Sequence, residues 1–216
     1  MMRALMTTAL LVFGLGMPLG APPLAHPHAS ITLKTSLKLN ADGRASMLHQ
    51  VWTFDPLYTA FVLEGVAETP ALAAQVVREV AEENLRNLGE YAYFTEIRLG
   101  GVPIVSEPAT NLTTALVESP NGARLQMAFS LPFATPLDLS DGTLVYAVFD
   151  PSFYIDMRHT VPSDARLDGG DGCALEMHQS EPSQDVANLA AALDKDAEPI
   201  PTLGRHFAQF VEVACR

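Results

Sequence analysis

The sequence predicts an α+β fold in which a mainly antiparallel β-sheet or sandwich packs against one long helix and several short ones. Short segments of alternating apolar and polar residues recur along the chain, and Gly, Pro, Asn and Asp separate them. One long segment, residues 70–88, instead has apolar residues at three- and four-residue spacing, which is typical of a helix with one buried face. No repeat or interdomain linker interrupts the pattern.

The first strand is predicted over residues 31–39, where Ile31, Leu33, Leu37 and Leu39 share one face. The turn sequence at residues 40–43 then favours a hairpin with a second strand over residues 44–55. In that strand Trp52 and Phe54 lie on the face expected to enter the core, and His49 lies on the opposite face.

The helices have recognisable boundaries. Asp55-Pro56 ends the second strand, and residues 57–63 can form a short helix before Gly65. Thr69 followed by Pro70 resembles a helix cap with proline in the first turn, and Gly89 ends the long helix. Beyond it we expect a small helix over residues 183–193 and strands over residues 93–99, 110–118, 124–132, 144–150, 153–161, 173–179 and 207–215.

Residues 1–25 have the pattern of a secretory signal peptide, with Arg3 before an apolar run that contains glycine and proline. We expect residues 26–216 to form a single domain in the periplasm, without membrane insertion once the leader is removed. Cleavage after Ala25 would make His26 the first residue of the mature chain. Cleavage after Gly20 or Ala21 is the alternative, because Pro23 stands where a small residue is preferred.

The net charge limits the classes of binding partner that we expect, and the cysteine content predicts a disulfide. The chain has a formal net charge of −12, and losing Arg3 with the leader makes it −13, which argues against nucleic acid and anionic membranes and is compatible with cations. Cys173 and Cys215 are the two cysteines, and in an oxidising compartment we expect them to form a disulfide rather than a thiolate metal pair. On the chain-entropy description such a link contributes about 4 kcal/mol.

His26-Pro27-His28 is the sequence feature best suited to a transition metal, since imidazole and a free amine are good ligands for zinc, nickel, cobalt and copper. Pro27 has no amide hydrogen, so a square-planar site built from backbone amides is blocked. Two imidazoles alone bind weakly, so another side chain must complete the site. The alternative is a solvated tail with no ligand.

Asp55 and Asp150 are the carboxylates predicted to complete such a site, because each precedes a proline at a strand end and the two ends could meet at one edge. Their alternative role is to stabilise turns by accepting backbone hydrogen bonds. Among the other histidines, the parity of His159 predicts a buried position, whereas His178 and His206 are expected at the surface.

The chain resembles domain-of-unknown-function family 1007. The resemblance rests on features spread over most of the chain: His26-Pro27-His28, the run 52–55 with Tyr58, Ala60 and Phe61, the segments 63–65 and 91–94, Asp150-Pro151 with Tyr154, and the two cysteines. It implies a periplasmic component associated with ABC-type transport of nickel, cobalt or zinc. Many relatives carry a loop that resembles an EF-hand calcium-binding loop after the segment matching residues 63–65. Residues 66–70 of this chain contain one carboxylate, and calcium needs several oxygen ligands, so we expect no calcium binding here.

No sequence motif for catalysis is present: there is no Gly-x-Ser-x-Gly, His-Glu-x-x-His, phosphate-binding glycine loop or Cys-x-x-Cys. We therefore expect a non-enzymatic accessory protein that passes a divalent transition metal to or from a membrane transporter permease. The alternatives are a module that docks on a permease or envelope partner without metal, and copper-dependent oxidation at an N-terminal histidine. A two-lobed solute-binding protein is disfavoured by the chain length.

Overall fold

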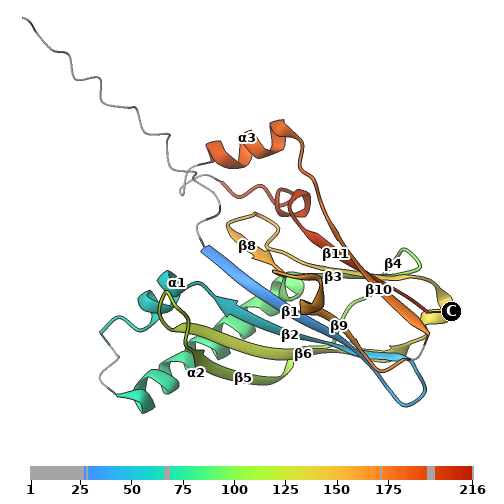
Figure 1. The fold of residues 1–216 in the computed structure, drawn as a ribbon, viewed down its shortest axis with the longest axis horizontal. Coiled ribbons are helices and arrows are strands. Elements are labelled where there is room, and N and C mark those ends of the chain that lie inside the picture. Colours follow the sequence, from blue (N-terminus) through green and yellow to red (C-terminus); the bar gives the residue numbers. More distant parts are fainter. Residues whose placement is uncertain (1–26, 28, 66–68, 171, 194–197, 216) are drawn as a thin grey trace, which may run out of the picture.

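The structure is a computed structural model that describes residues 27, 29–65, 69–170, 172–193 and 198–215 (Figure 1). Its α+β architecture, with two sheets and one long helix, confirms the predicted fold class. The predicted leader, with His26 and His28, lies outside the described residues.

The first sheet has β1 at the centre of its pairings, in the order β5-β6-β2-β1-β8, and β9 also pairs with β1. Pairing is antiparallel except at β8 and β9, which run parallel to the first and second halves of β1. The strands are β1 (Ala29–Leu39), β2 (Ala45–Phe54), β5 (Thr110–Val117), β6 (Arg124–Leu137), β8 (Ile155–Arg158) and β9 (Ala165–Asp168).

The second sheet is antiparallel, in the order β10-β11-β7-β3-β4. Its strands are β3 (Thr95–Leu99), β4 (Val102–Pro103), β7 (Leu144–Val148), β10 (Cys173–Gln179) and β11 (Gln209–Cys215). Figure 1 shows α1 and α2 at one end of the molecule and the C-terminus at the other.

The described helices are α1 (Pro56–Val62), α2 (Pro70–Leu88) and α3 (Gln184–Ala192), with 3₁₀ segments at η1 (Gly89–Phe94), η2 (Leu139–Asp141), η3 (Pro162–Asp164) and η4 (Gly204–His206). Thr69 caps α2 by accepting from the Leu72 amide at 3.2 Å, as the Thr-Pro pair predicts. None of the helices in the described ranges is both long and apolar enough to cross a bilayer.

Most of the buried strand residues meet in one main core. Leu33 and Trp52 from the first sheet are buried together with Tyr146 and Val211 from the second. Helix α2 adds Val77 and Ala81 to the same cluster, so it covers part of the first sheet on the side that also meets the second sheet. The predicted inward parity of Trp52 and Phe54 is confirmed.

A buried chain of hydrogen bonds crosses between the sheets. Tyr146 Oη lies 2.7 Å from Thr35 Oγ1, which lies 2.9 Å from His159 Nε2. Gln209 Oε1 lies 3.2 Å from His159 Nδ1, and the same oxygen accepts from the His159 amide at 2.7 Å. A carboxamide oxygen only accepts, so the proton of neutral His159 sits on Nδ1 and Thr35 donates to Nε2.

Cys173 and Cys215 form the expected disulfide. They are directly opposite each other in the β10–β11 ladder, so the bond ties edge strand β10 to the last strand of the described chain. It therefore closes the end of the molecule away from α1 and α2.

Several strand boundaries differ from the prediction for local reasons. Strand β3 starts at Thr95 because Tyr93 and Phe94 have left-handed φ values of 55° and 53°. The predicted strand 153–161 shortens to β8 because Phe153 also has a positive φ, of 59°, and residues 162–164 form η3. Strand β6 continues to Leu137, and the short strands β4 and β9 were not predicted.

Protonation of His159 should destabilise the fold. Burial lowers the pKa of His159 below its ordinary value, since the imidazolium would lose its hydration. The neutral histidine thus contributes stability that is fully present above about pH 6.5 and is lost as the pH falls through the lowered pKa. We expect the free energy of unfolding, measured by urea titration, to decrease below pH 6.5.

Replacing His159 by Gln should flatten that pH dependence, whereas the same replacement at exposed His178 should preserve it. An unchanged pH dependence in the His159→Gln variant would contradict the role assigned to this residue.

Candidate functional site

Asp55 ends β2 and begins α1, and both of its carboxylate oxygens are engaged. Oδ1 accepts from the Tyr58 amide at 2.8 Å, which caps α1, and Oδ2 accepts from the Ser30 amide at 3.0 Å. The Asp55 amide in turn donates to the Ser30 carbonyl at 3.0 Å. This carboxylate therefore joins the end of β2 to the start of β1, while its side chain stays partly exposed.

Arg124, which the sequence reading did not single out, secures the same strand end. Its Nε donates to the Phe54 carbonyl at 2.7 Å and its Nη2 to the Thr53 carbonyl at 2.9 Å. Because a guanidinium has several rigidly placed donors, one side chain on β6 can satisfy two carbonyls that β2 presents at its end.

Asp150, like Asp55, accepts backbone hydrogen bonds through its carboxylate. It is more buried, with 5% of its surface exposed. Its Oδ1 accepts from the Ser152 amide and hydroxyl at 2.9 and 2.8 Å, and its Oδ2 accepts from the Ile155 amide at 2.9 Å. The turn is packed against Gly204, where a Cβ would lie 1.8 Å from the Asp150 carbonyl oxygen. This close approach requires glycine at position 204.

The two aspartates are brought to the same end of the first sheet. Ser30, bound by Asp55, is in β1, and Ile155, bound by Asp150, pairs with Ala29 at the start of β1. Strands β2 and β8 flank β1, so the two carboxylates are held on opposite sides of this strand. Ala29 follows His28 in the sequence, which connects this end of the sheet to the predicted metal ligands.

The structure describes four other histidines, which either make separate contacts or lie exposed. His49 Nδ1 lies 3.1 Å from Ser130 Oγ, and its pKa is lowered by partial burial and by the nearby ammonium of Lys38. His159 belongs to the core network, which confirms the prediction that it is buried, while His178 and His206 are exposed as expected. Within the described ranges, no three His, Cys, Asp or Glu side chains are grouped so that they could hold a metal ion.

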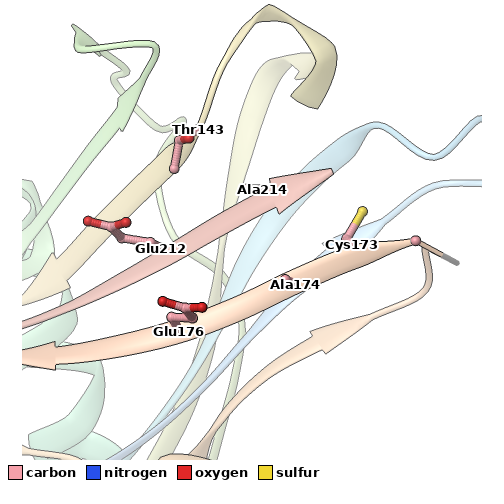
Figure 2. Close-up of a pocket in the computed structure, with 7 residues that line it drawn as sticks. Thr143, Cys173, Ala174, Glu176, Glu212 and Ala214 are labelled. Carbon is pink, nitrogen blue, oxygen red and sulfur yellow. The ribbon is translucent and has the colours of Figure 1, made fainter. Parts of the chain in front are cut away.

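An acidic hollow of about 430 Å³ lies over β10 and β11. Figure 2 shows its carboxylates, Glu176 and Glu212, side by side on these two strands. His178 Nε2 lies 3.8 Å from a carboxylate oxygen of each. All three side chains are at least partly exposed, and water screens such pairs strongly, so this arrangement adds little stability.

A second cavity, of about 310 Å³, lies at the opposite end, beside the start of β1. Its twelve lining residues carry no charge. Half of them are aromatic: Trp52, Phe54, Tyr58, Tyr91, Phe94 and Tyr154. Sequence reasoning assigned Trp52 and Phe54 to the core and missed the cavity, although all six aromatic residues belong to the features that carry the family resemblance.

The cavity wall is rigidly organised. Trp52 stacks on Phe94 with ring centroids 6.4 Å apart, and Phe54 stacks on Tyr58 at 4.8 Å. Asn84 of α2 donates to the Tyr58 hydroxyl at 3.2 Å, which connects α1 to α2. We refer to this cavity as the aromatic pocket.

Helix α1 also has an outer face. Leu57 is 78% exposed and Phe61 is 73% exposed, and their spacing of four residues puts them on the same side of the helix. Thr59 points the other way: it is buried, and its hydroxyl accepts from the Leu125 amide of β6 at 2.9 Å. The fold therefore fixes α1 firmly while leaving two large apolar side chains in water.

Removing the Asp55 carboxylate should weaken the fold. Asp55→Ala loses the α1 cap and leaves the Ser30 amide without its acceptor, so we expect about 2 kcal/mol of destabilisation. Asp55→Asn, which keeps one acceptor oxygen, should lose less. Urea unfolding measures both, with exposed Asp42→Ala as a control expected to stay within about 0.5 kcal/mol of the parent. Equal stability of Asp55→Ala and the parent would argue against the structural role.

Comparison with known proteins places the chain in a family. The profile of "Protein of unknown function (DUF1007)" matches residues 9–215. A protein of Haemophilus influenzae described as "Uncharacterized protein" is 23% identical over 218 residues, covering 97% of this chain and all of the relative. The family match spans nearly the whole sequence, including both aspartates, the aromatic pocket and the disulfide, and the chain belongs to the DUF1007 family.

Proposed function

We propose that this protein is a non-enzymatic periplasmic accessory of a transition-metal transport system, and that His26 and His28 capture a divalent ion. The ion is cargo, and zinc, nickel, cobalt and copper all accept imidazole ligands. The observation that carries the proposal is the pair of aspartates held on either side of the first residues of β1. Those residues directly follow the histidines in the sequence.

Asp55 is the better suited of the two carboxylates to complete the ligand set. Each of its oxygens accepts one backbone hydrogen bond, which leaves a lone pair on each for a metal. These bonds also fix the orientation of the carboxylate, as hydrogen bonds to metal-ligating side chains do in metal sites. Asp150 is more buried and already accepts three hydrogen bonds, so it contributes mainly by shaping the turn.

The mature chain starting at His26 should bind one divalent ion. We expect submicromolar affinity in calorimetric titrations with zinc, nickel, cobalt and copper, because two imidazoles, an amine and a carboxylate together supply four ligands. The double variant His26→Ala/His28→Ala should lose this binding while its unfolding free energy stays unchanged.

His178→Ala is the matched control, since it removes a histidine that lies on β10. Intact mass must first establish that the mature chain begins at His26. Failure of that chain to bind any of the four ions, or equal binding by the double variant, would refute the metal proposal.

A second candidate function is docking on a permease or envelope partner without metal, and the outer face of α1 favours it. Leu57 and Phe61 are large apolar side chains exposed on a helix that the core already anchors through Thr59. Exposed apolar residues grouped in this way are typical of interaction surfaces.

Polar replacement of this face should affect docking and leave the fold intact. For Leu57→Ser/Phe61→Ser we expect a change in unfolding free energy within about 0.5 kcal/mol, as for other surface substitutions. We also expect the double variant to lose complementation of the growth defect of a deletion strain. Val105→Ser, at a position that is 85% exposed on another part of the surface, is the control. Full complementation by the double variant would count against docking through α1.

A further inference from the structure

We propose that the aromatic pocket is a binding site for one uncharged, planar aromatic molecule. The pocket volume of about 310 Å³ is at the lower end of the range for small-molecule sites. A bicyclic or tricyclic ring system fits that volume, whereas a protein segment with several side chains does not.

The lining determines the chemical class of the ligand. A charged ligand would lose its hydration without meeting an opposite charge, because none of the twelve lining residues is Asp, Glu, Lys, Arg or His. Six of the lining side chains are aromatic, and aromatic rings favour contact with another aromatic ring over contact with a flexible chain. The ligand is therefore apolar, flat and uncharged.

One edge of the pocket is polar and would orient the ligand. Asn84 Nδ2 donates to Tyr58 Oη, so the Tyr58 hydroxyl keeps its own proton as a donor. Asn87, one turn further along α2, adds a second carboxamide at the exposed rim. A ligand with one hydrogen-bonding group at its edge matches this combination of apolar walls and polar rim.

The wall formed by η1 is held in an unfavourable backbone conformation. Ala92, Tyr93 and Phe94 have φ values of 49°, 55° and 53°, in the left-handed region that costs about 1–2 kcal/mol per non-glycine residue. Tertiary contacts stabilise it: Phe94 accepts from the Phe149 amide at 2.8 Å, and the Tyr93 hydroxyl accepts from the Ala109 amide at 3.0 Å. This conformation sets Tyr91 and Phe94 against the pocket, and such strain is often found at functional sites.

Trp52 provides a direct test, because it lines the pocket and is the single tryptophan of the chain. The probe is N-phenyl-1-naphthylamine, an uncharged aromatic dye, added to the mature protein in buffer containing a metal chelator. We expect saturable energy transfer from Trp52 to the dye with one dye per protein. The chelator separates this result from any failure of the metal proposal.

Three variants locate the site. Asn87→Phe fills the mouth without adding a tryptophan and should weaken binding about tenfold or more. Glu83→Phe adds the same side chain at an exposed position of α2 outside the pocket and should leave affinity unchanged. Trp52→Phe should abolish the energy transfer while preserving the enhancement of directly excited dye.

A comparison of uncharged, anionic and cationic dyes tests the proposed ligand class. An anionic anilinonaphthalene sulfonate and a naphthyl quaternary ammonium should both bind at least about tenfold more weakly than the uncharged dye. Tighter binding of the cation would overturn the proposed ligand class in favour of an aromatic cage for organic cations. Dye binding that is equally strong in Asn87→Phe, or self-association of the protein that Asn87→Phe abolishes, would overturn the small-molecule site.

Discussion

The two sheets depend on each other through buried hydrogen bonds that have one satisfactory arrangement. Thr35 of β1 connects Tyr146 of β7 to His159, and Gln209 of β11 accepts from the other side of the imidazole. A second bridge runs from Trp52 through fully buried Gln50 of β2 to Thr95 of β3, with both distances at 2.9 Å. Apolar packing alone tolerates small shifts, but a slip of either sheet would leave several of these groups unpaired in the core, at about 1–3 kcal/mol each. These bridges therefore fix how β1 and β2 sit against the second sheet.

The position of β1 also determines where the two aspartates and the aromatic pocket lie around its first residues. Asp55 and Asp150 can hold the neighbouring backbone only if β2 and β8 flank β1 in the observed register, with Ile31 opposite Phe54 and Ala29 beside Ile155. The same register sets Ile31, Trp52 and Phe54 as the floor of the aromatic pocket, which α2 and η1 then enclose. At the far end the Cys173–Cys215 disulfide secures edge strand β10, so that the covalent link and the candidate site are at opposite ends of the molecule.

The sequence-based predictions were correct where a local pattern decides the structure. Alternation placed Leu33 and Trp52 in the core, helical spacing and the Thr69 cap defined α2, and the even cysteine pair predicted the disulfide.

The sequence-based predictions failed where contacts between distant segments determine the structure. The parallel pairing of β1 with β8 and β9 involves residues more than a hundred positions apart, and no local signal specifies such a partner. The left-handed turn at Ala92 contradicts local preference and persists because Phe149 and Ala109 hold it from outside. The aromatic pocket was missed for the same reason, because its walls come from β1, β2, α1, α2, η1 and β8.

The Asp-Pro pairs show why residue type alone left the site undecided. An aspartate before a proline is suited both to binding backbone amides and to binding a cation, and only its surroundings separate the two uses. At Asp150 the carboxylate is almost completely buried and accepts three hydrogen bonds within the turn, and Gly204 lies close against the Asp150 backbone carbonyl. At Asp55 two backbone donors fix the carboxylate but leave it partly exposed, beside a strand that begins one residue after His28. A carboxylate held in one orientation loses little conformational entropy when it binds an ion, so the structural bonds of Asp55 are consistent with the metal role that we propose for it.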